Sequence, residues 1–243
     1  MATELILVLT MTRSGSSNFI NMLRNNKNID VNGEIFNRRK MFLNERNKKI
    51  VEKIYGNRYF ENIHKNKKYI EVLELLKHKC NKKYIIFKIL FSQYYTIKQH
   101  IGTQLFDKII ILERKNILDR YISSKKCKIT ENYYKIDTSN LKIHFNKIEY
   151  LLFKKKHYNN FKKYNNDCKN KDFINITYTK KINIEKFCLE MNNFLPNLYL
   201  IISDIKQLPI QDKESNYKNK LHHYWLYKKF ITKEINSFSG DSD

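Results

Sequence analysis

The sequence is poor in the residues that interrupt or cross-link a chain. Only two of its 243 residues are proline and five are glycine, so no flexible linker divides it and we expect one domain over residues 1–243. No apolar run reaches the roughly 18 residues of a membrane span, and the opening MATELILVLT lacks the basic start of a signal peptide. We therefore expect a cytoplasmic protein that does not associate with membranes.

Cysteines are few and widely separated, at Cys80, Cys127, Cys168 and Cys188. They form no C-x-x-C pair, and neither they nor the histidines have a spacing that suits zinc. We expect free thiols and no metal site.

Acidic side chains are also scarce: 24 Asp and Glu stand against 47 Lys and Arg, a formal charge of +23. Such an excess is typical of proteins that attract polyanions. Alanine occurs only at Ala2, however, and Asn, Lys, Ile, Tyr and Phe are abundant, which is the bias of an AT-rich genome and would leave much of the lysine as solvated surface. Both interpretations stay open. Because 42% of the residues are apolar and 14% aromatic, we expect a folded globule.

Apolar runs of strand length alternate with segments of helical spacing. We expect strands at 5–11, 84–90, 108–112 and 172–177, and helices at 17–26, 39–55, 67–79, 116–125, 141–164, 184–194 and 216–235. Residues 198–202 are ambiguous, and 235–243 are expected to be a flexible tail. The alternation predicts an α/β fold, a P-loop-like three-layer sandwich whose central, mostly parallel sheet is covered by helices on both faces.

The clearest local motif is LVLTMTRSGSSNF, residues 7–19. A buried strand leads through a loop of small residues to a helix N-terminus, where unpaired N–H groups and the helix dipole favour phosphate. Gly15 allows close approach of an anion, and Arg13 adds a charged donor. Further donors follow at Ser14, Ser16, Ser17 and Asn18. The motif lacks the lysine and first glycine of an ATP- or GTP-hydrolysing loop, and taken alone it equally fits a structural helix cap.

A second motif is IIILERKNILDRYISSKK, residues 109–126. Arg114 stands at the carboxyl end of an expected strand, the edge at which open α/β sheets bind ligands. Ser123 follows about two and a half turns along the next helix. The two side chains could hold a second phosphate, or they could be an ordinary surface arginine and a polar helix position.

Together these motifs resemble a known family. The strand–RSGSS–helix opening resembles the 5′-phosphosulfate loop of sulfotransferases that use 3′-phosphoadenosine-5′-phosphosulfate (PAPS), and LERKNILDRYIS resembles their 3′-phosphate motif. NGEIFN, residues 32–37, resembles the G-E-x-F element of the small bacterial branch that includes the trehalose and nodulation-factor (NodH-like) sulfotransferases. The resemblance covers residues 5–125. It implies metal-independent transfer of a sulfuryl group from PAPS to a hydroxyl acceptor, a small molecule or a glycan.

The resemblance also implies roles for individual residues. Glu34 would be the general base, Arg13 and its loop would hold the phosphosulfate, and Arg114 with Ser123 would hold the 3′-phosphate. Tyr178, in NITYT, would meet the adenine.

On the acceptor side, Lys88 and Gln93, in FKILFSQ, would contact the sulfate or the acceptor, and Phe36 would line the acceptor pocket. Arg38 and Arg39 would face an anionic acceptor or simply solvent.

Two other functions remain open at this point. The Lys-rich stretch FKKKHYNNFKKYNN, residues 153–166, could hold nucleic acid through charge and aromatic stacking, although no recognition motif for a specific nucleic acid accompanies it. The chain could also be an inactive relative that binds adenosine bisphosphate without turnover. The sequence does not indicate an oligomeric state.

Overall fold

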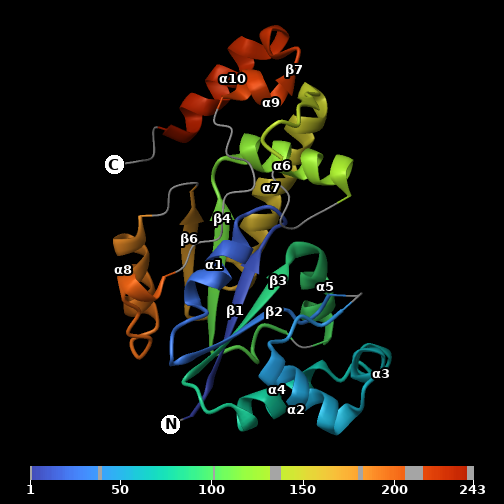
Figure 1. Cartoon of the computed structure of the whole chain (residues 1–243), viewed down its shortest axis with the longest axis vertical. Coiled ribbons are helices and arrows are strands. Elements are labelled where there is room, and N and C mark those ends of the chain that lie inside the picture. The colour runs from blue at the N-terminus through green and yellow to red at the C-terminus, as the bar shows by residue number, and fades with distance from the viewer. Residues whose placement is uncertain are drawn as a thin grey trace.

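The computed structural model in Figure 1 describes residues 2–37, 40–100, 102–131, 138–179, 183–205 and 216–239. Its centre is an all-parallel sheet of five strands in the order β2-β3-β1-β4-β6, flanked by helices. The strands are β1 (Glu4–Thr10), β2 (Ile29–Glu34), β3 (Tyr84–Leu90), β4 (Lys108–Arg114) and β6 (Phe173–Tyr178). The predicted α/β architecture, a parallel sheet between two layers of helices, is confirmed.

The central strand β1 is buried on both faces, and its side chains alternate between two apolar cores. Leu5, Leu7 and Leu9 face one core, whereas Ile6 and Val8 face the other. The first core is covered by α2 (Glu45–Tyr55), α3 (Tyr59–Asn66), α4 (Tyr69–Lys79), α5 (Phe91–His100) and α7 (Lys147–Asp167), and the second by α1 (Ser16–Leu23) and α8 (Ile184–Phe194).

A third apolar cluster lies beyond the carboxyl edge of the sheet, at the top of Figure 1. It joins α6 (Ile117–Thr130), the start of α7 and the C-terminal segment, which consists of α9 (Tyr217–Lys220), β7 (Leu221–His222) and α10 (Tyr224–Ser239). There β7 pairs in parallel with the short strand β5 (Ile143–His144). None of the helices in the described segments has both the length and the apolar content that a membrane crossing requires.

The C-terminal segment differs from the single helix predicted over 216–235. Leu221 is buried in the third cluster and pairs with Ile143, and His223 adopts a left-handed backbone (φ 53°), so the chain leaves the helical path between α9 and α10. Because α10 continues to Ser239, residues 235–239 of the expected tail are helical.

Two predicted helices begin later than expected because asparagines cap them. Asn44 accepts a hydrogen bond from the backbone of Asn47 and starts α2 at Glu45, and Asn146 likewise starts α7 at Lys147. The ambiguous residues 198–202 form no strand, and a short 3₁₀ helix, η1, follows at Ile202–Asp204.

Besides the short elements β5, β7 and η1, three longer ones were not predicted: β2, α3 and α5. In β2 only Ile29 and Val31 are apolar, and Asp30 and Asn32, which alternate with them, are nevertheless buried. The Asn32 side-chain oxygen accepts hydrogen bonds from the Asn44 backbone at 3.1 Å and from the Asn47 amide at 3.0 Å. Buried polar residues whose hydrogen-bond partners lie more than ten positions away therefore occupy strand positions that pattern analysis assigns to a loop.

Candidate functional site

The connections that follow the neighbouring strands β1 and β4 run in opposite directions from the carboxyl edge of the sheet. The chain passes from β1 to β2 on one side and from β4 towards β6 on the other. Such a switch point is where open α/β sheets bind ligands. Thr10 pairs with Leu112, which brings the loop after β1 beside the end of β4.

The loop after β1 makes a tight turn into α1. Arg13 and Gly15 both adopt left-handed backbones, with φ of 64° and 81°, and the Ser14 N–H donates to the Met11 carbonyl at 3.3 Å. The Ser14 side chain is fully buried, and its hydroxyl has no hydrogen-bond partner among the described residues. The loop leads directly to the N-terminus of α1, which begins at Ser16, and helix N-termini favour phosphate and sulfate.

The predicted 3′-phosphate residues lie against this loop. The Arg13 Nε donates to Ser123 Oγ at 2.9 Å, and the Arg114 Nη1 donates to the Arg13 carbonyl at 3.3 Å. Residues from two motifs about a hundred positions apart therefore meet at one place.

Arg114 pairs with a carboxylate, that of Asp119, which also binds a buried lysine; neither partner was predicted from the sequence. Asp119 lies 3.3 Å from the Arg114 Nη2 and 2.9 Å from the Lys220 Nζ, and Lys220 is 1% exposed. Asp119 could have been noticed in the sequence, because it is an acidic residue three positions after an asparagine at the expected start of a helix. In the structure its backbone N–H donates to the capping Asn116 side chain at 2.9 Å. Lys220 had no such signal in a chain with 47 basic residues.

The C-terminal segment closes this side of the site. The Asn116 amide donates to the Tyr217 hydroxyl at 3.2 Å, and burial together with the nearby Asp119 raises the pKa of Tyr217. The phenol is therefore protonated and neutral at physiological pH.

Tyr178 lies directly over Gly15. A Cβ placed on Gly15 would lie 2.3 Å from the tyrosine ring, so only glycine fits beneath it. The Asn18 amide donates to the Tyr178 hydroxyl at 3.4 Å. The ring predicted to meet adenine is thus at the phosphate loop, where Ser16 is buried and Ser17 exposed.

Glu34 lies at the end of β2 in a buried cluster with both predicted acceptor-side polar residues. Its Oε1 is 3.2 Å from the Lys88 Nζ, and its Oε2 accepts from the Gln93 and Asn37 amides, each at 2.9 Å. Of the four lone-pair positions of a carboxylate, one on Oε1 stays open with respect to the described residues.

An irregularity in β2 aims Glu34 at this cluster. The register between β2 and β3 shifts between Val31 and Glu34, and such bulges redirect side chains. Gly33 permits the shift, because its N–H donates to the Phe42 carbonyl at 2.7 Å and any Cβ would lie 2.8 Å from the Phe42 Cβ.

Phe36 packs into the protein interior. It is 2% exposed, and its ring centroid lies 5.0 Å from that of Tyr69 in the core between the sheet and α4. At an acceptor pocket, Phe36 would therefore support the residues that line it and would not contact the acceptor itself. Arg38 and Arg39 lie outside the described residues.

A second missed group lies beneath the loop. The Arg120 Nε donates to the Thr12 carbonyl at 3.0 Å, its Nη1 is 2.9 Å from His157 Nδ1, and His157 Nε2 is 2.7 Å from Glu113 Oε1. Burial lowers the pKa of Arg120 to about 10, with Arg114 contributing, and burial also lowers the pKa of His157. At neutral pH the arginine is charged and the histidine neutral.

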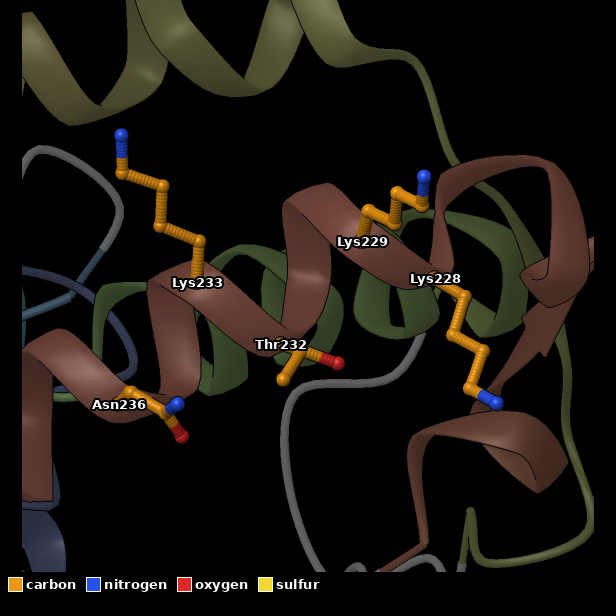
Figure 2. A pocket seen from close by; sticks show the side chains of 5 residues that line it. All are labelled: Lys228, Lys229, Thr232, Lys233 and Asn236. Carbon is orange, nitrogen blue, oxygen red and sulfur yellow. The ribbon is translucent and has the colours of Figure 1, made fainter.

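Within the described segments no three His, Cys, Asp or Glu residues gather as a metal site would require, and the four cysteines are free thiols. A shallow surface hollow lies on α10, far along the chain from both motifs. Figure 2 shows that its lysines do not converge: Lys229 and Lys233 point to one side of the helix and Lys228 to the other. The buried donors at the carboxyl edge make the better candidate, since a bound anion needs several donors aimed at one point.

No protein-family model matches the chain, and no curated protein matches it in sequence. The interpretation of the site therefore rests on the geometry and chemistry of its own residues.

Proposed function

We propose that this protein transfers a sulfuryl group from PAPS to a hydroxyl group of an acceptor, possible acceptors being small molecules and glycans. The observation that carries the proposal is the contact of Arg13, Ser123 and Arg114, which joins the two phosphate-type motifs at one point of the sheet edge. A donor with phosphates at both its 5′ and 3′ positions needs two anion sites within one nucleotide's reach.

The charge of the site supports a strongly anionic ligand. Arg13, Arg114 and Lys220 bring three positive charges, and Asp119 offsets one of them. Such a cluster of positive charges attracts a phosphate monoester close to its dianionic form. The Ser14 hydroxyl, which has no hydrogen-bond partner among the described residues, lies in the same loop.

The chemistry assigned to the residues is an in-line displacement at sulfur. The acceptor oxygen forms a bond to sulfur, the bond from sulfur to the phosphate oxygen breaks, and adenosine-3′,5′-bisphosphate leaves. Arg13 and the N–H groups at the start of α1 would stabilise charge on the leaving phosphate. The open lone pair of Glu34 Oε1 would take the acceptor proton.

The spacing of the two clusters is compatible with this division of labour. Glu34 ends β2, which lies two strands from β1 in the sheet order, a lateral separation of about 10 Å at the usual strand spacing. The base and the phosphate loop therefore lie at the same edge of the sheet, separated by the width of β3.

The nucleic-acid alternative has little stacking surface in α7. Three of the rings in its Lys-rich stretch, those of His157, Phe161 and Tyr164, are buried, and Tyr158 is half exposed. Buried rings cannot stack on bases, so binding would depend mainly on sequence-independent charge.

The decisive measurement is thermal unfolding with adenosine-3′,5′-bisphosphate and with ATP. We expect the bisphosphate alone to raise the melting temperature, by the equivalent of about 2.7 kcal/mol at a hundredfold excess over Kd. Arg114→Ala and Ser123→Ala should each abolish the preference. Lys108→Ala, at the other end of β4, and Ser124→Ala, one residue along α6, are the matched controls and should keep it. Equal stabilisation by both nucleotides would refute the donor assignment.

Turnover separates an enzyme from an inactive relative. With ³⁵S-labelled PAPS and a panel of sugars and phenols, the wild type should label at least one acceptor. Glu34→Gln should bind the bisphosphate normally but label the acceptor about 10²- to 10⁴-fold more slowly. Full activity in Glu34→Gln would eliminate the base, and binding without any labelling by the wild type would favour the inactive relative.

A further inference from the structure

The helices α6 and α7 contact three successive residues where the chain passes from β1 into the loop that follows it, residues 11–15, which is the candidate donor loop. The Tyr164 hydroxyl donates to the Thr10 carbonyl at 3.0 Å, and the Asn160 amide lies 3.9 Å from the Met11 sulfur. The Thr12 carbonyl accepts from Arg120, a residue of α6, at 3.0 Å. Thr12 directly precedes Arg13, whose left-handed backbone aims the loop.

Arg120 is in turn held by α7. Its guanidinium carbon lies 4.5 Å from the Phe153 ring centroid, and its Nη1 lies 2.9 Å from His157 Nδ1. Since a guanidinium can only donate, His157 Nδ1 accepts and the ring proton must be on Nε2. That proton is donated to Glu113 Oε1 at 2.7 Å. The tautomer of this fully buried histidine is therefore determined by its two partners.

We propose that His157 is a positioning residue, which through Arg120 fixes the Thr12 carbonyl and so holds the donor loop in its anion-binding conformation. This inference rests on the proposed function for its effect on nucleotide binding, but its effect on the loop is independent of it. The chain runs Glu113–His157–Arg120–Thr12, and only the loop at its end would touch a ligand. Through His157, the buried face of α7 takes part in the site, whereas the exposed face of this helix is rich in lysine.

The substitutions that test this are His157→Phe and His157→Gln. Phenylalanine keeps the packing against Phe161 but removes both hydrogen bonds, whereas the glutamine amide can accept from Arg120 and donate to Glu113 as the ring does. We expect His157→Phe to weaken adenosine-3′,5′-bisphosphate binding by about tenfold. We expect His157→Gln to stay within about twofold of the wild type, because it preserves the charged hydrogen bond.

A second readout follows the loop without any ligand. Amide hydrogen exchange in residues 10–16 should accelerate in His157→Phe and stay near wild-type rates in His157→Gln. His78→Phe, the same change at an exposed position of α4, is the control. If His157→Phe does not fold, Glu113→Ala serves instead, because Glu113 is 31% exposed and its loss should act in the same direction without opening the core.

The outcomes are distinguishable. Unchanged exchange in the loop and unchanged nucleotide affinity in a folded His157→Phe would overturn the positioning role. Faster loop exchange in a protein whose wild type binds no bisphosphate would support that role while refuting the proposed function. Loop exchange that rises equally in His157→Gln and His157→Phe would mean that packing, and not the hydrogen bonds, holds the loop, and would also overturn the proposal.

Discussion

At the scale of single residues, the site depends on one glycine and the ring above it. Gly15 has a left-handed backbone, and the Tyr178 ring occupies the space that any Cβ would need. Two separate costs therefore oppose substitution: the conformational cost of a left-handed L-residue, about 1–2 kcal/mol, and the displacement of the tyrosine.

A pair of alanine substitutions separates these two costs. Gly102 also has a positive φ, of 69°, but a Cβ there would meet nothing closer than 3.8 Å. Gly102→Ala should lower the free energy of unfolding by about 1–2 kcal/mol, and Gly15→Ala by about 1–3 kcal/mol more, because of overpacking. Urea denaturation measures both. Adding Tyr178→Ala to Gly15→Ala should recover much of the excess; equal losses for the two glycines would mean that the ring moves away freely.

The same scale shows which site residues a sequence can reveal. Arg13 and Arg114 follow directly after apolar runs, and the carboxyl ends of parallel strands share one edge, so their proximity could be predicted. Their partners could not. Lys220 lies about a hundred residues from the aspartate it pairs with, and His157 lies 37 residues from Arg120, and no local pattern encodes such pairings.

At the scale of elements, strands buried on both faces were the easiest to predict. β3 is apolar except for Lys88, β4 contains the apolar run of residues 109–112, and β3 begins and ends where the pattern predicts. The edge strand β2 was missed, because Asp30 and Asn32 find their hydrogen-bond partners on the segment that leads into α2. The start of α7 was misplaced because Ile143 belongs to β5, whose partner β7 lies near the other end of the chain.

His157, which connects α7 to the loop through Arg120, should make the stability of the protein depend on pH. His157 faces Arg120 from α6, which disfavours protonation, and Glu113 from β4, which favours it; burial is the largest influence, and the pKa is lowered from 6.5. As the pH falls, His157 therefore becomes protonated in the unfolded chain before it does so in the folded protein. The contribution of neutral His157 to the free energy of unfolding is complete above about pH 6.5 and is lost as the pH falls below that value.

We therefore expect the wild type to lose stability between pH 7 and pH 5 with a slope of at most about 1.4 kcal/mol per pH unit from this group. His157→Gln, which does not titrate, should show a smaller slope. Urea denaturation at a series of pH values measures the difference, and the carboxylates, common to both proteins, cancel. Parallel pH profiles for the two proteins would show that His157 does not titrate on unfolding in this range.

At the scale of the whole molecule, the formal charge of +23 admits two origins, compositional bias and attraction of an anionic ligand. The lysines of α10 discriminate between them. Lys228, Lys229 and Lys233 are exposed and border the surface hollow on α10 (Figure 2). The opposite face of the helix is buried through Ile231 and Glu234, so these lysines can be changed without disturbing the core.

Changing all three lysines to glutamine removes three of the 47 basic residues and none of those at the sheet edge. At physiological salt, charges farther than about 8 Å are largely screened, so we expect the Kd for adenosine-3′,5′-bisphosphate to stay within about twofold, because the buried donors determine it. At low salt the screening length grows to about 30 Å at 0.01 M, and the association rate should fall, because long-range steering depends on total charge. Stopped-flow binding at both salt concentrations measures the two effects, with Arg114→Ala as the variant that loses affinity at either. A tenfold loss of affinity in the lysine variant at physiological salt would place the anion site on α10 and not between β1 and β4.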